Sequence, residues 1–392
     1  MVPSYFRVFI LSCLSLIGFQ TTALFAQTPD PTDPGCSMVG GRQVCMPGKE
    51  PLIITPGYQY GFIIAHHSDM LYLTQGHVQV TEVCIARPSH GHHYWDQLFN
   101  YPEPGVAFSV FDLGNPQNLG NLYSINPYFD FPFNTGIQTR ICLRVGTGLS
   151  YITKPFDPVT NYKDIAIGSH VNGFVNLRLT WKQEFCKNFR SDIGISFSHA
   201  SNGAFKTPNL GLNMPALYGG LAYMIKPCPP KIHLDTIPKC DHSRFFSVGI
   251  AGAISQISPP GGNYYPAVIV TGMVSKYWNS KNLWSLGLEI FYNDANYAEV
   301  HHSDSTAKRK QYIQPAAKIG YALCIGRFSM PLEVGVYFYD HVNGELVPMY
   351  THVGLRYQLS RRVLAGVMLK TYFARAEFFE WGISYRFIHS KC

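Results

Sequence analysis

The sequence predicts an all-β protein, a transmembrane antiparallel β-barrel of about 14 to 16 strands. Charged residues make up 14% of the 392-residue chain and hydrophobic residues 46%, whereas charged residues are about a quarter of a soluble domain. Beyond the N-terminus no apolar stretch reaches the roughly 18 to 20 residues that a spanning helix needs. Runs with period-two hydrophobicity, separated by turn signals, extend from residue 57 to 387. If this chain crosses a membrane, it therefore does so with β-strands.

The alternation is clearest towards the C-terminus, where Leu332, Val334 and Val336 alternate with Glu333 and Gly335. Similar runs occupy residues 175–182, 352–359 and 379–387. In a closed barrel the apolar series faces lipid and the polar series faces the lumen. The 25 Tyr and 26 Phe fit the aromatic girdles at the two membrane interfaces.

The chain divides into three predicted regions. Residues 1–26 have the pattern of a signal peptide, with Arg7 before an apolar stretch that ends in small residues. Residues 27–56 are rich in Pro and Gly and are expected to form a periplasmic leader. Residues 57–392 are expected to form the barrel, with the active-site segment at 190–213. We therefore predict a protein of the bacterial outer membrane.

Net charge and cysteine spacing exclude several classes of site. The net charge is +7, but no long Lys/Arg run indicates a nucleic-acid partner. Export would permit disulfides between Cys36 and Cys45, and between Cys228 and Cys240 or Cys186. Three cysteines inside strand patterns are expected to act as small hydrophobes: Cys84, Cys142 and Cys324. No CxxC pair occurs and the His pairs lack ligand partners at a recurring spacing, so we expect no metal and no cofactor.

Loop lengths orient the predicted barrel, because outer-membrane barrels have short periplasmic turns and longer external loops. The turns at 279–281 and 360–362 are short, whereas the segments 153–169 and 293–311 are long. The strand at about 190–201 then runs outward and ends at the external surface.

This outward strand ends in two side chains that can react together. The lipid-facing series Ile193, Ile195 and Phe197 continues as His199 and Ser201, and residues at i and i+2 of a strand share one face. A serine hydroxyl is a weak nucleophile until a neighbouring imidazole accepts its proton. We therefore expect a base and a nucleophile side by side at the membrane surface.

Two short motifs resemble a known family. Ser-His-Ala-Ser-Asn-Gly at 198–203, followed by Pro-Asn-Leu-Gly-Leu-Asn at 208–213, resembles the signature of the outer-membrane lipid A 3-O-deacylases, a family also described as acyloxyacyl hydrolase-like. Further similarity extends the resemblance over about residues 57–227. The resemblance implies a serine esterase that needs no cofactor and removes an ester-linked acyl chain from lipid A of lipopolysaccharide in the outer leaflet.

The resemblance also implies roles for single residues. His199 and Ser201 fall on the family's catalytic pair, and Asn202 and Asn209 fall where amide groups could help to form an oxyanion hole. Where the characterised enzymes place a Glu to orient the histidine, this chain has Asn213. An amide oxygen can orient an imidazole but offers the imidazolium no negative charge.

Several alternatives stay open at this level. Asp157 or Asp164, from an external loop, could replace Asn213 as the group that orients His199. The chain could instead be a porin-like channel, because a barrel of about 16 strands can hold an aqueous lumen, or an outer-membrane phospholipase. The channel hypothesis rests on basic residues predicted to face the lumen: Arg144, Arg178, Lys182, Arg356 and Lys370.

Overall fold

The computed structural model describes residues 36–39, 42–45, 52–91, 93–134, 138–186, 188–225, 237, 239–257, 259–303, 308–339, 348–372 and 375–387. The predicted signal peptide lies outside these residues, as does most of the predicted leader. Within the leader, β1 (Cys36–Val39) and β2 (Arg42–Cys45) pair antiparallel with Cys36 opposite Cys45. They belong to a unit of their own, Met1–Pro51.

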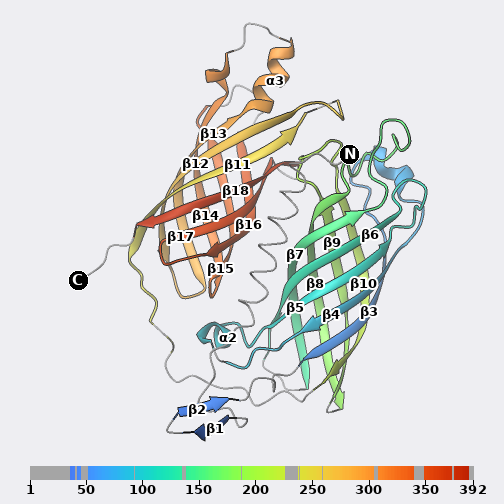
Figure 1. Cartoon of the computed structure of the whole chain (residues 1–392), viewed down its shortest axis with the longest axis vertical. Helices are drawn as coiled ribbons and strands as arrows, with labels where there is room; N and C mark the ends of the chain where they lie inside the picture. Colours follow the sequence, from blue (N-terminus) through green and yellow to red (C-terminus); the bar gives the residue numbers. More distant parts are fainter. Residues whose placement is uncertain are drawn as a thin grey trace. The chain divides into compact units, whose positions relative to one another are not determined.

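The rest of the chain forms two closed antiparallel barrels of eight strands each, drawn from blue to green and from yellow to red in Figure 1. The first barrel consists of β3 (Ile53–Gly61), β4 (Val78–Ala86), β5 (Glu103–Asp112), β6 (Asn121–Pro132), β7 (Thr139–Ile152), β8 (Val171–Cys186), β9 (Phe189–Ser201) and β10 (Leu212–Met224). The second consists of β11 (Arg244–Gln256), β12 (Tyr264–Tyr277), β13 (Asn282–Asn293), β14 (Ile313–Ile325), β15 (Phe328–Tyr337), β16 (Met349–Gln358), β17 (Val363–Tyr372) and β18 (Arg375–Phe387).

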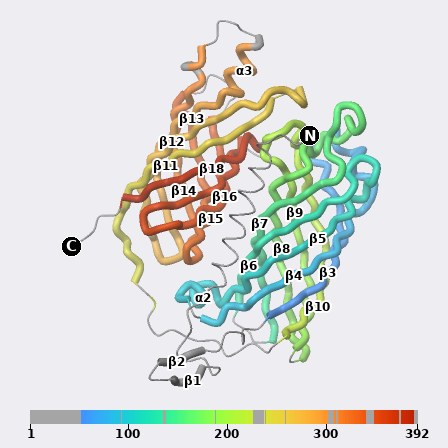
Figure 2. Tube along the Cα trace, viewed as in Figure 1, coloured from blue at the N-terminus to red at the C-terminus, as the bar shows by residue number. Residues whose placement is uncertain are grey.

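The predicted fold class is confirmed, and the strands of the two barrels together lie within the predicted number. They do not form one large barrel, however, because β10 pairs back onto β3 before β11 begins, with Tyr223 opposite Ile54. In the same way β18 closes onto β11, with Ile383 opposite Ile250. Period-two hydrophobicity identifies strands and faces but does not say which strands are neighbours. The tube in Figure 2 follows this sequential order around each barrel.

The connections follow the predicted alternation of long and short loops. In the first barrel the longer loops after β3 and β7 emerge at one end, together with those after β5 and β9. We call this the long-loop end. The first loop contains η1 (Ser68–Leu73), and the loop after β13 in the second barrel contains α3 (Asp294–Ser303) and η2 (Arg309–Tyr312). At the opposite end of the first barrel, the connection between β4 and β5 contains α2 (Tyr94–Leu98) and is longer than a tight turn.

The outer faces of both barrels are apolar. Exposed fractions reach 58% for Ile195 on β9, 68% for Leu217 on β10, 65% for Leu286 on β13 and 58% for Ile383 on β18. Large apolar side chains are favourable on the outer face of a barrel when the hydrocarbon of a membrane surrounds them. Among the described residues, no helix is long and apolar enough to cross a membrane.

The lumen of the first barrel is filled by paired charges. Arg178 donates to both carboxylate oxygens of Glu82 at 2.8 Å, and Arg144 donates to Asp130 at 2.8 and 3.0 Å. The network contains four acidic and four basic side chains among the described residues: Glu82, Glu103, Asp130, Asp192, Arg144, Arg178, Lys182 and Arg190. An apolar cluster of strand and loop residues, including Met70, Phe111 and Ile167, packs within this unit.

The cysteines do not follow the predicted disulfide scheme in full. Cys186 and Cys240 are free thiols, so the pairing of Cys228 with either of them is wrong. The other described cysteines of the two barrels are free and buried, as expected for cysteines inside strands: Cys84, Cys142 and Cys324. Cys84 is more than a small apolar side chain, because its thiol donates to Glu82 at 3.1 Å and accepts from Arg144 at 3.2 Å.

Candidate active site

The predicted reacting pair lies on the outer face of the first barrel, at its long-loop end. On β9 the alternating side chains Asp192, Ser196 and Ser198 are buried in the lumen. His199 and Ser201 belong to the opposite series, which also contains the exposed Ile195. His199 is half-buried, and Ser201 is buried, with 4% of its surface exposed.

Asn213 contacts the imidazole of His199 directly. The two residues are register partners on β9 and β10, and Nδ1 of His199 lies 2.7 Å from Oδ1 of Asn213. Asp157 and Asp164 do not take this place. Asp157 instead accepts backbone N–H bonds from Val159 and Thr160 at 2.9 and 2.7 Å.

Asp164 has a structural role in the loop between β7 and β8. One carboxylate oxygen accepts from the backbone N–H groups of Ala166 and Ile167, at 2.9 and 3.3 Å. The other oxygen is buried without a partner. Burial raises the pKa of Asp164 to about 7, because the ionised form has lost its water. The carboxyl group fixes the loop, and His199 is not among its partners.

Sequence reasoning missed a second histidine in this row. Nδ2 of Asn213 lies 3.2 Å from Nδ1 of His66, whose Nε2 lies 3.1 Å from the carbonyl oxygen of Leu210. His66 follows β3, and the backbone bond from Ile64 N–H to the Asn213 carbonyl, at 2.9 Å, continues the β3–β10 pairing beyond the strand. The sequence drew attention to His66 only as a member of the His66–His67 pair, weighed as a metal site. It gave no sign of the contact with Asn213, because that contact forms only through closure of the barrel.

Gly211 places the loop backbone against both His199 and Ser201. A Cβ atom on Gly211 would lie 2.9 Å from Cε1 of His199 and 3.4 Å from Cβ of Ser201. The residue has a φ of +79°, which favours glycine. Its N–H donates to the carbonyl of Ala166 at 2.9 Å. The Cε1 edge of the imidazole and the serine therefore border the same stretch of backbone, although Ser201 and His199 do not hydrogen bond to each other here.

The two asparagines predicted for the oxyanion hole have different surroundings. The side-chain amide of Asn202 donates to Ser169 Oγ at 2.9 Å and to the Lys206 carbonyl at 2.8 Å, so both of its N–H bonds are used. Oδ1 of Asn209 accepts from the Asn202 backbone N–H at 2.9 Å. Within the described part of the chain, Nδ2 of Asn209 donates to no protein group. These contacts favour a bracing role for Asn202 and leave Asn209 with a free donor.

The turn after Asn202 supplies further donors. Gly203 and Ala204 have φ values of +60° and +58°, a conformation that costs a non-glycine residue energy and persists only where the surroundings impose it. Successive N–H groups in such a turn point into a concavity that suits an anion. In the described structure neither N–H has a hydrogen-bond partner.

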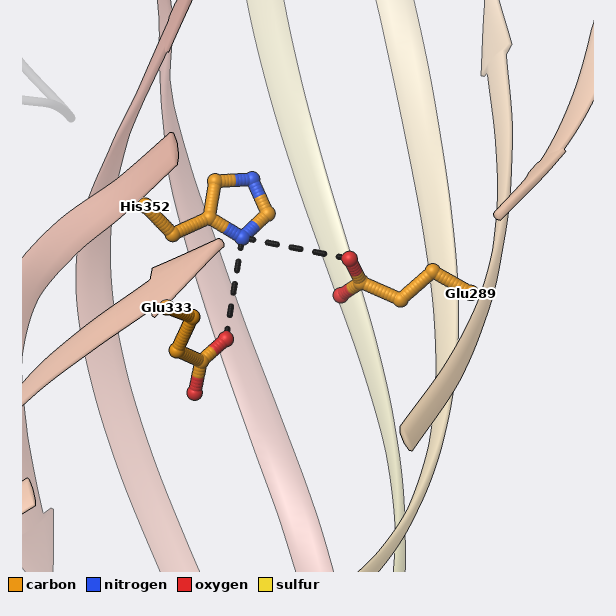
Figure 3. A group of neighbouring side chains, drawn as sticks. All are labelled: Glu289, Glu333 and His352. Carbon is orange, nitrogen blue, oxygen red and sulfur yellow. Dashed lines mark ion pairs between the residues drawn. The ribbon is translucent and has the colours of Figure 1, made fainter. Parts of the chain in front are cut away.

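A second group of titratable side chains lies in the lumen of the other barrel. Figure 3 shows Glu289, Glu333 and His352, whose ligand-type atoms lie within 4.8 Å of one another. Nζ of Lys318 lies 2.5 Å from Glu289 and 2.6 Å from Glu333, so an ammonium group already occupies the space between the two carboxylates. We therefore interpret the group as a buried ion-pair network, in which Arg356 adds a bond of 2.6 Å to Glu333.

Two family models match the chain, each within one barrel. Residues 85–222 match the family described as "Lipid A 3-O-deacylase (PagL)", and residues 244–390 match "Acyloxyacyl hydrolase, C-terminal domain". The matches cover most of the chain. The chain belongs to the lipid A 3-O-deacylase family. The resemblance read from the motifs is thereby confirmed, and membership indicates an outer-membrane hydrolase of the deacylase type.

Comparisons with single proteins are less informative. No curated protein matches the chain. Among solved structures, a KdgM porin covers 85% of this chain and 99% of its own length at 6% identity, with a TM-score of 0.18. A triple mutant of the Rhodopseudomonas blastica porin covers 86% and 100% at 8% identity, with a TM-score of 0.19. These scores are too low to carry any argument about this chain.

Proposed function

We propose that the chain is a serine esterase that removes an ester-linked acyl chain from lipid A of lipopolysaccharide in the outer leaflet. The observation that carries the proposal is the distance of 2.7 Å between His199 Nδ1 and Asn213 Oδ1. His199 lies two residues before Ser201, in the same outward series of β9. An imidazole held at Nδ1 by an acceptor carries its proton there, which leaves Nε2 free to act as a base. Membership in the deacylase family supports the same reaction.

The reaction proceeds by acyl transfer. His199 Nε2 takes the proton of Ser201 as Oγ attacks the ester carbonyl, and returns it to the sugar oxygen when the C–O bond breaks. Water then attacks the acyl-enzyme with His199 again as the base, which releases the fatty acid and restores Ser201. Asn213 Oδ1 holds the imidazolium in place through both steps but adds no negative charge. The chemistry requires no metal ligand among these residues.

The tetrahedral intermediates need donors near Ser201. We assign this role to Asn209 Nδ2 and to the N–H groups of Gly203 and Ala204, which are free in the described structure and belong to the segment that follows the serine. One oxyanion donor contributes roughly 10²- to 10³-fold to kcat. Asn202 contributes indirectly, because its amide ties this turn to Ser169.

The position of the pair favours a lipid substrate. His199 and Ser201 lie in the same series as the exposed Ile193 and Ile195, which would contact acyl chains. The lumen of the first barrel is filled by ion pairs and gives a soluble substrate no route to the serine. Closed barrels of eight strands are also too narrow for an open channel, so the porin alternative is not favoured.

The test is deacylation of lipid A by purified protein in detergent micelles, followed by mass spectrometry. Wild type should release an ester-linked fatty acid, and Ser201→Ala and His199→Ala should lose activity by at least about 10³-fold. Ser191→Ala is the matched control and should keep full activity, because Ser191 lies near the opposite end of β9 and its hydroxyl donates to the Gln183 carbonyl at 3.5 Å.

Two outcomes would contradict the proposal. Equal fatty-acid release by wild type and Ser201→Ala would exclude the serine as nucleophile. Release from purified phospholipid, with none from lipid A, would establish a phospholipase instead.

A further inference from the structure

His66 completes a row of three hydrogen-bonded side chains on the outer face of the first barrel. The row begins at His199 on β9, passes through Asn213 on β10 and ends at His66 beyond β3, with distances of 2.7 and 3.2 Å between the bonded atoms. Neighbouring strands hold each member: Asn213 is the register partner of His199, and Ile64 bonds to the backbone of Asn213. The chain of bonds is therefore built into the strand pairing.

The far end of the row decides where the protons lie. Nε2 of His66 faces the Leu210 carbonyl at 3.1 Å. A carbonyl oxygen can only accept, so this nitrogen carries a proton and Nδ1 of the neutral ring has the lone pair. The Ile64 carbonyl also lies near Nδ1, but at 3.4 Å. A proton on Nδ1 would gain only that longer bond and would lose the bond to Leu210.

The lone pair on His66 then sets the orientation of Asn213. The group that faces Nδ1 of His66 must be a donor, which is Nδ2 of the amide, and Oδ1 consequently faces His199. Because Oδ1 only accepts, His199 must donate from Nδ1, and its second nitrogen is left unprotonated. Each step follows from the one before, and the first is fixed by a backbone carbonyl.

We propose that His66 is a positioning residue, which fixes the orientation of Asn213 and thereby the tautomer of His199 that can accept a proton from Ser201. This inference rests on the proposed esterase function. A carboxylate at position 213 would need no such partner, because its two oxygens are both acceptors. An amide has one acceptor and one donor end, and in the reversed orientation it would stabilise the tautomer of His199 that cannot act as the base.

The decisive experiment is a double-mutant cycle between positions 66 and 213. His66→Leu should lower kcat about 3- to 10-fold, the size expected for one lost hydrogen bond, with KM nearly unchanged. In the Asn213→Asp background the same substitution should change kcat by less than about twofold, because the carboxylate has no orientation to choose. His66→Asn keeps an acceptor close to the position of Nδ1 and should recover most of the loss.

His67→Leu is the matched control. His67 is the next residue in the chain, its side chain is 53% exposed, and its ring interacts with Asp69 and not with Asn213. This variant should retain wild-type kcat. An equal loss of kcat for His66→Leu in the wild-type and Asn213→Asp backgrounds would overturn the proposal, because it would show that the side chain only supports the fold.

A spectroscopic measurement separates this inference from the proposed function. Nitrogen-15 NMR of labelled histidines in detergent micelles should show His199 protonated at Nδ1 in wild type and in Asn213→Asp, and a mixture of tautomers in His66→Leu. This readout does not require activity: a protein that is inactive on lipid A but has these spectra would refute the esterase and support the positioning role. If wild type is active on lipid A but the His199 spectra of His66→Leu are the same as those of wild type, the positioning role is refuted and the esterase function stands.

Discussion

The two lumens differ in how their buried carboxylates are paired. In the first barrel Glu82 accepts two hydrogen bonds from Arg178, whose side chain has no exposed surface. In the second barrel one oxygen of the buried Glu380 has no hydrogen-bond partner. Both ring nitrogens of the fully buried His352 also lack a hydrogen bond there. The second lumen contains a cavity of about 100 Å³. Small inward-facing residues line much of this cavity, among them Ser247, Gly249, Ser285, Gly366 and Gly382.

Each lumen holds buried polar atoms without a hydrogen-bond partner, such as Nε of Arg178 in the first and the ring nitrogens of His352 in the second. The two lumens differ in the pairing of their carboxylates, because the unpaired lumen carboxylate oxygen among the described strand residues belongs to Glu380. The first barrel is a filled cylinder, and its candidate active site lies outside, where β9, β10 and the loops around Asp164 and Gly211 meet. Among its described outward side chains, the second barrel has no row of hydrogen-bonded side chains comparable to His199, Asn213 and His66. A rigid filled barrel is a suitable support for a site that must keep His199 and Ser201 in register.

The largest expected effect comes from breaking one charge in each lumen. Glu82→Gln leaves Arg178 buried without its carboxylate, while Arg144 keeps its bonds to Asp130. The substitution should lower the free energy of unfolding by about 3 to 5 kcal/mol. Glu380→Gln removes a group that already has an unpaired oxygen and should cost less than about 1 kcal/mol. Urea unfolding in detergent, followed by tryptophan fluorescence, measures both. Equal costs would remove the distinction between the two interiors.

The outer faces should behave alike in the two barrels. Ile195→Arg on β9 and Leu288→Arg on β13 each replace a well-exposed side chain, at 58% and 62%. Each should cost about 2 to 4 kcal/mol when the side chain lies near the middle of the bilayer. Refolding into lipid vesicles at graded urea concentrations gives the values, with Ile195→Val as the control. A negligible cost for Leu288→Arg would show that the second barrel does not face lipid there.

Two matched glycine substitutions test whether the loop before β10 shapes the candidate active site. Gly211→Ala brings a Cβ to 2.9 Å from the His199 ring and forces alanine into a φ of +79°, so kcat should fall roughly 10-fold or more. Gly261→Ala in the second barrel has a similar φ of +86° but meets no atom within 4 Å. It should cost about 1 kcal/mol of stability and leave kcat unchanged. Equal kcat in the two variants would show that Gly211 does not shape the site.

The most local effect concerns pH and the loop between β7 and β8. Burial raises the pKa of Asp164 from its ordinary value of 3.8 to about 7. A raised folded-state pKa means that the protonated carboxyl contributes stability below about pH 4, and that this contribution is lost as the pH rises through 7. Hydrogen exchange of residues 153–170 should therefore be slower at pH 5 than at pH 8, after correction for intrinsic rates. Asp164→Asn should remove the difference, and a difference that persists would contradict this role.

Much of the candidate site could be predicted from the sequence because it depends on local order. The alternation through Ile193, Ile195 and Phe197 placed His199 and Ser201 on the outer face of a strand, and the structure has them there. The family resemblance implied that Asn213, or in its place Asp157 or Asp164, orients His199, and Oδ1 of Asn213 lies 2.7 Å from Nδ1 of His199. The functional roles of these residues stay predictions until the variants are assayed.

The division into two barrels and the role of His66 could not be predicted in this way. The hydrophobic alternation along β10 is the same whether this strand pairs with β3 or with β11. The period therefore does not show where a barrel closes. His66 lies 147 positions from Asn213 in the chain, and it is followed by a second histidine, His67, whose ring interacts with Asp69.

By itself, the sequence determined which side chains of a strand share its outer face, which share its inner face, and that His199 and Ser201 lie on the same face. These features depend on the two-residue repeat of a strand. Only the tertiary structure decided that the strands close as eight and eight, and that β3 therefore returns beside β10. That closure brings His66 to Asn213 and so bears on the tautomer of His199. The physical reason is that strand faces are local, whereas hydrogen bonds between distant strands exist only once the barrel has closed.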